Sequence, residues 1–329
     1  MPPAAERLRA LLAALPVVID DVACAVGAVD VPSYPDGPRP TSVVTLAGRG
    51  ARGVGEHVGW TAAVHARFRD ETVPRVPAGG WTVETWSAAV AERTADPYER
   101  AALEAAAIDL ALRQAGTTCA ALLGARLRPV RYVVSFGIEV DPLTALARES
   151  RGECKIDVDA AWSDEVLAAV ASSGRVAVVD WKTGGETAEH ERLHQALPSA
   201  LIEDPGAAAG AWSTSAFAER VSADGWLARA ADLDALPRAP AAVNVKPGRM
   251  GGVLEALALA ARAEARGIAT YVGGMFEVGP GRSQIQVLAA LLSPDGPNDV
   301  APLAVAGREA SRPQRLEIAD AAPGFGATA

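Results

Sequence analysis

Three carboxylates and one lysine stand at the ends of four consecutive short apolar runs in the middle of the chain. The carboxylates belong to Asp180, Glu203 and Asp224, and the lysine is Lys246. They are spaced 23, 21 and 22 residues apart, about the length of one strand plus one helix. This rhythm indicates repeated βα units that form a parallel sheet.

Parallel barrel strands end at one mouth, so the four charged ends would converge there. Three carboxylates in one place repel one another unless a cation lies between them. Oxygen ligands in that number favour Mg²⁺. The alternative is that each acid only ends its strand and caps the following helix, but three acids at regular spacing, with a lysine next, favour the metal site.

The composition argues against several other functions. Of the 329 residues, 50% are hydrophobic and 22% are charged, and the net charge is −9 without any basic run. Nucleic acids and anionic membranes bind clustered Lys and Arg, so neither is expected as a partner. The three cysteines form no CxxC pair and no signal peptide is recognisable, which together predict a cytoplasmic protein.

Two other kinds of site are also disfavoured. The glycine-rich text at residues 48–55 lies between strands, without the following helix that a dinucleotide site requires. The four histidines, His57, His65, His190 and His194, form no HxH or HExxH motif. A zinc hydrolase is therefore not expected.

The elements around the charged strands divide the chain into two parts. Residues 5–15 are expected to form a helix, residues 17–60 are β-rich, and residues 62–124 are mostly helical. One helix is expected to start after Asp96, where Pro occupies the first position and acids follow. Residues 1–125 thus predict an α+β domain.

From residue 126 to 307 the pattern is that of a (β/α) barrel. Strands beyond the four charged ones are expected at 131–136, 155–158 and 268–272. An eighth is expected near 300–305. The tail, residues 308–329, is expected to pack back on the first domain or to fray.

Five stretches of text carry a resemblance to a known family. They are Gly55-Glu56 and residues 101–111, 201–205, 244–252 and 273–282. With them the chain resembles the enolase superfamily, in particular the branch of muconate lactonizing enzymes, o-succinylbenzoate synthases and dipeptide epimerases. The likeness covers roughly residues 20 to 310, and the last two stretches are the most specific.

The resemblance implies an N-terminal α+β capping domain followed by a modified (β/α)₇β TIM-type barrel, an α/β fold. It implies Mg²⁺ on Asp180, Glu203 and Asp224, with Lys246 on the opposite wall as an acid/base group. The implied reaction removes a proton alpha to a carboxylate, because a bound Mg²⁺ stabilises the enediolate and a desolvated lysine accepts the proton. The outcome would be racemisation, epimerisation, cycloisomerisation or dehydration, by an isomerase or lyase.

The second barrel strand departs from the family pattern. That branch has Lys-x-Lys there, and this chain has Lys155-Ile156-Asp157. Lys155 and Asp157 share an inward face, so Asp157 stands in the slot of the principal acid/base lysine. It could act as a base, bind a cationic substrate group, or pair with Lys155 or Lys246.

The third and fifth strands depart as well. Lys182 lies two residues after Asp180, where the family usually has Asn. One hypothesis is that Lys182 replaces the missing lysine, and the alternative is that it points to solvent. After Asp224 the usual acidic neighbour is Gly225, so the third ligand is expected to be held less securely than the other two.

Four further residues are candidates for substrate binding. Glu277 could contact substrate or pair with a lysine across the barrel. Arg282 could meet an anionic group or form a structural salt bridge. Ser135 ends the first barrel strand, and Tyr34 lies in the Pro-rich loop where the family closes over its substrate.

Two functional hypotheses follow. The first is a Mg²⁺-dependent enzyme acting on a small carboxylate metabolite, expected to form homo-oligomers. The second is a homologue that has lost catalysis and acts as a ligand-binding or structural protein, for which the Lys-x-Asp change is the main support.

Overall fold

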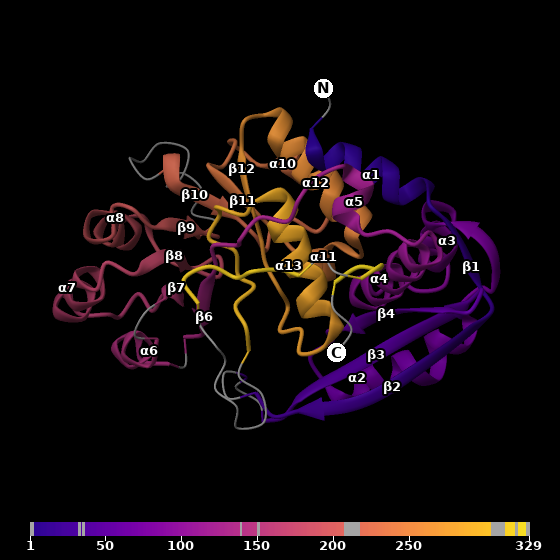
Figure 1. Ribbon diagram of the computed structural model, residues 1–329. Coiled ribbons are helices and arrows are strands. Elements are labelled where there is room, and N and C mark those ends of the chain that lie inside the picture. The colour runs from indigo at the N-terminus through magenta and orange to yellow at the C-terminus, as the bar shows by residue number, and fades with distance from the viewer. Residues whose placement is uncertain are drawn as a thin grey trace.

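A computed structural model describes residues 3–31, 34, 37–138, 140–149, 152–206, 218–303, 313–319 and 322–326. The chain forms two lobes, an N-terminal cap and a curled parallel sheet with its helices (Figure 1). The predicted order, an α+β cap followed by a TIM-type barrel, is confirmed. Among the described residues, no helix is both long and apolar enough to cross a membrane.

The described residues of the cap form two antiparallel sheets and five α-helices. Its strands are β1 (Pro16–Ile19), β2 (Asp21–Val29), β3 (Arg39–Gly48), β4 (Ala51–His57) and β5 (Gly79–Thr82). Strands β2, β3 and β4 form one sheet, and β1 pairs with β5. Its helices are α1 (Ala4–Ala14), α2 (Ala62–Arg67), α3 (Val83–Ala91), α4 (Pro97–Gln114) and α5 (Cys119–Leu123), with a π-helical turn (Phe68–Thr72) and a 3₁₀ turn (Val73–Arg75) after α2.

Helix α4 packs unusually closely on strand β4. A Cβ atom on Gly53 would lie 2.4 Å from the carbonyl oxygen of Ala106, and one on Gly55 would lie 2.0 Å from that of Ala102. Glycine in the strand and alanine in the helix therefore let the two backbones approach. This contact holds the end of β4 against the first turns of α4.

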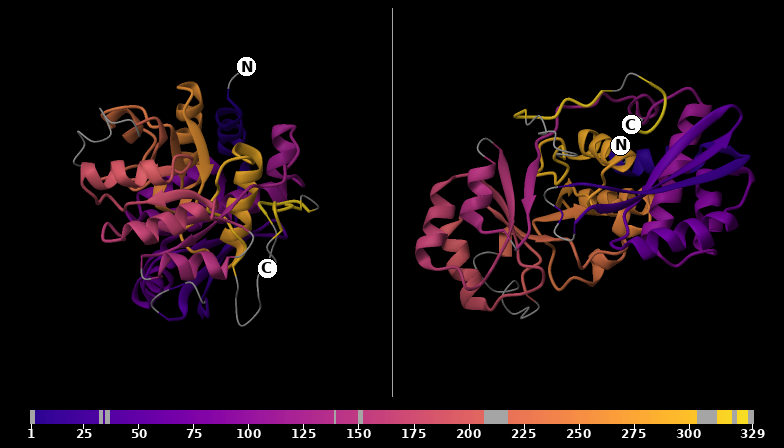
Figure 2. Two further views of the ribbon diagram at one scale, coloured as in Figure 1. Left: turned by 90° about the vertical axis from the view of Figure 1, so that its left-hand side faces the viewer. Right: turned by 90° about the horizontal axis from the view of Figure 1, so that it is seen from below.

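In the described part of the barrel lobe, the strands form one seven-stranded parallel sheet. Its strands, hydrogen-bonded in chain order, are β6 (Val133–Phe136), β7 (Glu153–Asp157), β8 (Val176–Asp180), β9 (Leu201–Glu203), β10 (Val221–Ala223), β11 (Ala242–Val245) and β12 (Ala269–Val272). The accompanying helices are α6 (Pro142–Arg148), α7 (Asp164–Ser172), α8 (Thr187–Ala196), α10 (Asp232–Ala235), α11 (Pro247–Met250), α12 (Val253–Ala265) and α13 (Pro280–Leu292), and a 3₁₀ turn (Ala218–Arg220) precedes β10. Figures 1 and 2 show α6, α7 and α8 on the outer side of β6 to β9.

The predicted eighth strand near 300–305 is absent from the described part of that range, residues 300–303, and residues 304 and 305 lie outside the described residues. The sheet is instead closed just before it by single parallel bridges. Asn298 bridges to Tyr132 beside β6, and Asp299 bridges to Gly273 after β12.

The side chain of Asn298 explains how two single bridges can close the barrel sheet. Its amide oxygen accepts from the backbone N–H of Val272 at 2.8 Å, and its amide nitrogen donates to the carbonyl of Arg131 at 2.9 Å. A buried amide thus supplies bonds that a longer strand would otherwise make.

Carboxylates of the cap bind the starts of two barrel helices. Glu56 accepts from the backbone N–H groups of Val278 at 2.7 Å and Gly281 at 3.0 Å, at the start of α13. Glu104 accepts from that of Leu254 at 2.8 Å, at the start of α12. Helix N-termini favour negative charge, so these acids attach the cap to the second half of the barrel.

A third acid of the cap contacts the tail. Asp109 accepts from the backbone N–H of Phe325 at 2.7 Å, and the N–H of Gly324 donates to the carbonyl of Thr117 at 2.9 Å. The described residues 322–326 therefore lie against the end of α4. Both Glu56 and Asp109 belong to the text that carries the family resemblance.

Candidate active site

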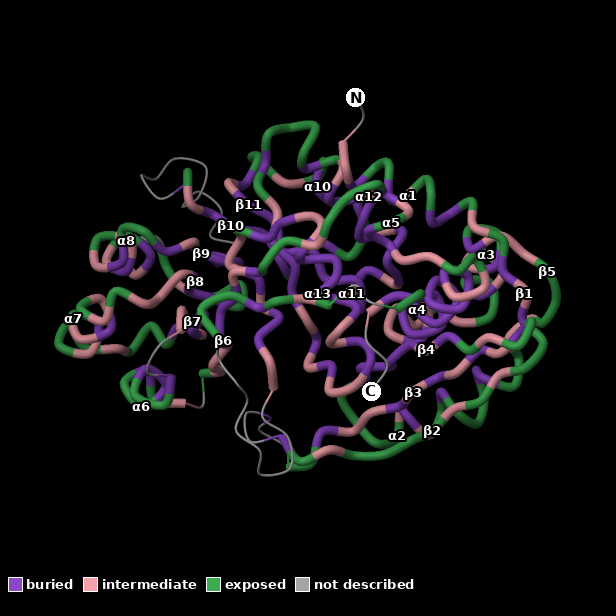
Figure 3. Tube along the Cα trace, viewed as in Figure 1, coloured by how far each residue is buried: buried purple, intermediate pink, exposed green. Residues whose placement is uncertain are grey.

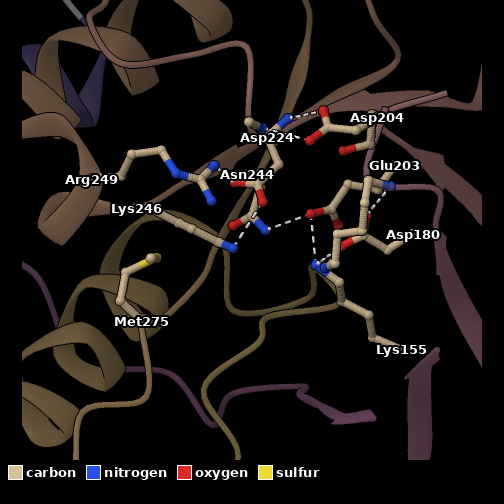
Figure 4. A network of polar contacts seen from close by, with 12 residues as sticks. Lys155, Asp180, Glu203, Asp204, Asp224, Asn244, Lys246, Arg249 and Met275 are labelled. Atoms are coloured by element: carbon tan, nitrogen blue, oxygen red, sulfur yellow. Dashed lines mark hydrogen bonds and ion pairs between the residues drawn. The ribbon is translucent and has the colours of Figure 1, made fainter. Parts of the chain in front are cut away.

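Three acids converge at the C-terminal ends of adjacent strands. Asp180 ends β8, Glu203 ends β9, and Asp224 follows β10 directly. Each offers one carboxylate oxygen, and these atoms all lie within 4.8 Å of one another. All three side chains are buried (Figure 4), so their charges are poorly screened by solvent.

A lysine flanks the three acids on each side. Lys155 of β7 places its Nζ 2.6 Å from Glu203 Oε1 and 3.0 Å from Asp180 Oδ2. Lys246, directly after β11, places its Nζ 2.8 Å from Asp224 Oδ2. Five consecutive strands therefore present lysine, acid, acid, acid and lysine in that order (Figure 4).

Glu203 is held in place by groups that the sequence did not single out. Tyr271 Oη donates to Glu203 Oε2 at 2.8 Å and lies 2.7 Å from Ser222 Oγ. Asn244 Nδ2 donates to Glu203 Oε1 at 3.3 Å. These contacts connect β9 with β10, β11 and β12 across the centre of the sheet.

Asp224 is held securely, so the expectation of a weakly placed third ligand is wrong. Arg249 Nη1 lies 2.5 Å from Asp224 Oδ1, opposite the contact with Lys246. Asp204 supplies the carboxylate missing at position 225, because it accepts from the backbone N–H groups of Asp224 at 2.8 Å and Gly225 at 2.6 Å. A Cβ on Gly225 would lie 2.8 Å from Asp204 Oδ2, which explains the glycine.

The balance of charge differs among the three acids. Burial raises the pKa of Asp180, but Lys155 and Lys182 outweigh it and lower that pKa to about 2. Burial also raises the pKa of Asp224, and there Lys246 and Arg249 again produce a net lowering. For Glu203, burial together with its two acidic neighbours overcomes Lys155 and raises the pKa to about 8.

These surroundings fit a divalent cation. Three buried carboxylate oxygens form the hard donor set that Mg²⁺ prefers, and a cation there would add positive charge that Lys155 alone does not supply to Glu203. Asn244 Oδ1 is also buried, without a hydrogen-bond partner among the described residues. Asp180, Glu203 and Asp224 are therefore the residues that would hold the ion.

Asp157 pairs with Lys182, not with the predicted partners Lys155 or Lys246. The Nζ of Lys182 lies 3.0 Å from Asp157 Oδ1 and also contacts Asp180 Oδ2. The backbone of Lys182 has a φ of +49°, which is uncommon for a residue other than glycine. The side chain is 59% exposed, but its ammonium group turns back to the acids at the barrel mouth.

The predicted substrate-binding residues lie in two places. Glu277 is buried, its carboxylate accepts from the backbone N–H of Met275 at 3.0 Å, and Arg282 donates to the Glu277 carbonyl at 3.1 Å. Both therefore hold the loop after β12. Ser135 is half-buried on β6, beside Lys155 in the sheet register.

Tyr34 lies in an aromatic cluster where the cap meets the barrel. Its hydroxyl donates to the carbonyl of Trp60 at 3.0 Å, and its ring packs edge-on against Phe276 with centroids 5.7 Å apart. Phe276 directly precedes Glu277, so Tyr34 contacts the loop at the barrel mouth.

Arg39 ties the same two segments together and was not anticipated. It is buried, and its Nη2 donates to the carbonyl of Val58 in the cap at 2.8 Å and to that of Met275 in the barrel at 3.2 Å. Its guanidinium also lies 5.1 Å from the ring centroid of Tyr34. An arginine in a Pro-rich stretch carries no sequence signal for burial.

Comparison with known families matches nearly the whole chain. Residues 126–306 match the family described as "Domain of unknown function (DUF8230) C-terminal domain", and residues 10–122 match its N-terminal counterpart.

Comparison with other proteins finds relatives named as a racemase, an epimerase and a lactonizing enzyme. An N-succinylamino acid racemase from Thermus thermophilus is 29% identical over 294 residues, covering 80% of this chain and 78% of that protein. A dipeptide epimerase from Methylococcus capsulatus, crystallised with a Mg ion, is 26% identical with a TM-score of 0.76, covering 94% of this chain and 99% of that one. The muconate lactonizing enzyme of Pseudomonas putida shares the fold at 20% identity, with a TM-score of 0.73 and coverage of 94% and 96%.

Proposed function

Because the chain belongs to the DUF8230 family and to the enolase superfamily, we propose that it is a Mg²⁺-dependent isomerase. It would remove the proton alpha to the carboxylate of a small metabolite. Its relatives include enzymes named racemase and epimerase, which favours racemisation or epimerisation over cycloisomerisation and dehydration.

The observation that carries this proposal is the row of charged groups on β7 to β11. Asp180, Glu203 and Asp224 would bind Mg²⁺, which when bound stabilises negative charge developing on the substrate carboxylate. Lys246 at one end of the row and Lys182 beside the other end would lie near the substrate carbon. Burial of the site excludes water and so strengthens each of these electrostatic contacts.

Racemisation needs one group that accepts a proton and another that donates one on the opposite face of the carbon. Lys246 stands at one end of the row. We assign the opposite role to Lys182, whose ammonium group reaches the other end beside Asp157 and Asp180. Lys155 is fully buried between two acids, which favours a role in holding the site.

The two departures from the family pattern, at positions 157 and 182, are then explained together as the relocation of one lysine. A lysine is lost at position 157 and another is gained at Lys182, and the aspartate at 157 binds the new ammonium group at 3.0 Å. Asp157 would therefore be a positioning residue that directs Lys182 toward the site.

The test is exchange of the alpha proton in D₂O with Mg²⁺, followed by NMR or mass spectrometry over a panel of N-acyl amino acids and dipeptides. We expect deuterium in at least one substrate with the wild-type protein. Lys246→Ala and Lys182→Ala should each reduce racemisation by at least 100-fold, because each removes the group on one face of the carbon. Glu203→Gln should abolish exchange together with Mg²⁺ binding.

A double substitution tests the role of Lys182 separately. Asp157→Lys combined with Lys182→Asn restores the family pattern and should retain activity, whereas Lys182→Asn alone should not. Full activity of Lys182→Asn alone would remove Lys182 from the mechanism. Bound carboxylates without any exchange in the wild type would favour the ligand-binding alternative.

A further inference from the structure

A second cluster of ligand-type side chains lies in the cap, outside the barrel site. It joins His57, the last residue of β4, to Asp96 and Glu99 at the start of α4. One ring nitrogen of His57 and one carboxylate oxygen from each acid lie within 4.8 Å of one another. His57 and Glu99 are buried, and Asp96 is partly exposed.

The neighbouring histidine determines which nitrogen of His57 carries its proton. His65 Nε2 lies 3.0 Å from the carbonyl of Gly59, which can only accept, so that nitrogen is protonated. A neutral His65 with its proton on Nε2 carries a lone pair on Nδ1. That lone pair faces Ser42 Oγ at 2.8 Å and His57 Nδ1 at 3.2 Å.

Two lone pairs facing each other at 3.2 Å would repel, so His57 Nδ1 carries a proton and donates it to His65. A neutral imidazole with its proton on Nδ1 has none on Nε2. His57 Nε2 therefore holds a lone pair. That atom is fully buried and has no hydrogen-bond partner among the described residues, an arrangement that costs stability unless something binds there.

We propose that His57, Asp96 and Glu99 bind a divalent transition metal ion of the Zn²⁺ class. One imidazole nitrogen and two carboxylate oxygens are a donor set that such ions accept, with water completing the coordination. The bond from His57 Nδ1 to His65 matches the outer contact that orients metal-binding histidines. The barrel site differs, because its acids offer oxygen alone.

Arg67 forms ion pairs with both acids of the cluster in the described structure. Its Nη2 lies 3.0 Å from Asp96 Oδ2 and 3.4 Å from Glu99 Oε1. Its side chain is 47% exposed, so it can turn outward and leave Asp96 Oδ2 and Glu99 Oε1 to an ion. The other oxygens of the two acids keep their bonds from the N–H of Tyr98 and from the hydroxyls of Thr72 and Thr94. Arg67 and the metal therefore compete for the same acids.

The site would also stiffen the contact between cap and barrel. Val58 follows His57 directly, and its carbonyl accepts from Arg39, which also binds the barrel loop at Met275. An ion on His57 would fix the end of β4 from which this connection starts.

The first measurement is electron paramagnetic resonance of the whole protein with one equivalent of Cu²⁺, a probe that binds such donors tightly. We expect hyperfine coupling to one imidazole nitrogen, and displacement of Cu²⁺ by excess Zn²⁺. His57→Gln should remove the coupling, whereas His194→Gln, the matched loss of a histidine elsewhere, should not. Absence of imidazole coupling in the wild type, or its survival in His57→Gln, would overturn the proposal.

Arg67→Gln provides a second arm that leaves all three ligands intact. Competition predicts that this variant binds Zn²⁺ at least 10-fold more tightly by calorimetry in the presence of Mg²⁺. A cluster whose only role is to hold the fold predicts no Zn²⁺ binding in either protein, and that result would also reject the site.

Discussion

The two halves of the barrel are anchored differently. Helices α12 and α13 share one continuous hydrophobic core with α1, α3 and α4 of the cap, and the cap carboxylates bind the starts of these two barrel helices. Strands β7 to β9 and helices α6 to α8 pack in a separate, smaller core. In Figure 3 the outward faces of α6, α7 and α8 are exposed, whereas α4 and α12 are largely buried.

The candidate active site lies across the boundary between these halves. Asp180 and Glu203 come from the half with its own core, and Lys246 comes from the half attached to the cap. The contacts of Glu203 with Tyr271 and Asn244 cross the boundary. The polar site thus holds together two parts of the barrel that share few apolar contacts.

The largest expected effect comes from a matched pair of leucine substitutions. Leu257→Ala on α12 opens a cavity in the shared core and should lower the free energy of unfolding by about 3 to 4 kcal/mol. Leu167→Ala on α7 should cost about 2 kcal/mol and mainly speed hydrogen exchange in α6 to α8. Both side chains are buried.

Urea denaturation and hydrogen exchange mass spectrometry measure the two variants. Equal losses of stability, with exchange rising evenly through the chain, would mean that the barrel unfolds as one unit and that the two halves are not distinct.

Mg²⁺ should reduce the difference between the halves. A ligand that binds only the folded state at 100 times its dissociation constant stabilises it by about 2.7 kcal/mol. Because Asp180 and Glu203 stand on β8 and β9, the gain in protection should appear mainly in that half. Thermal unfolding and hydrogen exchange with and without Mg²⁺ test this, and Glu203→Gln should show no such gain.

Lowering the pH should reduce the stability of the cap and the barrel half attached to it first, because of His57. Its pKa in the folded protein is about 3, against about 6.5 in an unfolded chain. Between these values the unfolded chain binds a proton that the folded chain does not, so stability falls as the pH falls. The loss should reach about 2 kcal/mol between neutral pH and pH 5.

This pH dependence is measured by denaturation at several pH values with EDTA present. His57→Gln should flatten the slope over the same range. An unchanged slope would place the acid sensitivity elsewhere in the chain.

Much of this arrangement follows from local sequence patterns. The convergence of Asp180, Glu203 and Asp224 follows from spacing alone, because equal βα units bring strand ends to one edge. The close contact of α4 with β4 depends on glycines in the strand that lie opposite alanines in the helix. Such features depend on period and residue size, which are legible in a single sequence.

Other features depend on contacts between distant residues and could not be predicted. Asp204 supports Asp224 from the neighbouring strand end, and Arg39 crosses to a loop more than 230 residues away. The apolar text near residue 300 indicated a strand, but the amide of Asn298 makes the closing bonds. A side chain that replaces backbone pairing leaves no periodic signal.

The contact between helices α1 and α12 has a consequence for synthesis on the ribosome. Helix α1 begins at Ala4, yet it packs on α12, which ends at Ala265. The cap therefore cannot complete its core until about four-fifths of the chain has been made. Until then, the apolar surface that packs on α12 stays exposed to solvent. Early fragments of this protein should accordingly bind chaperones until α12 emerges.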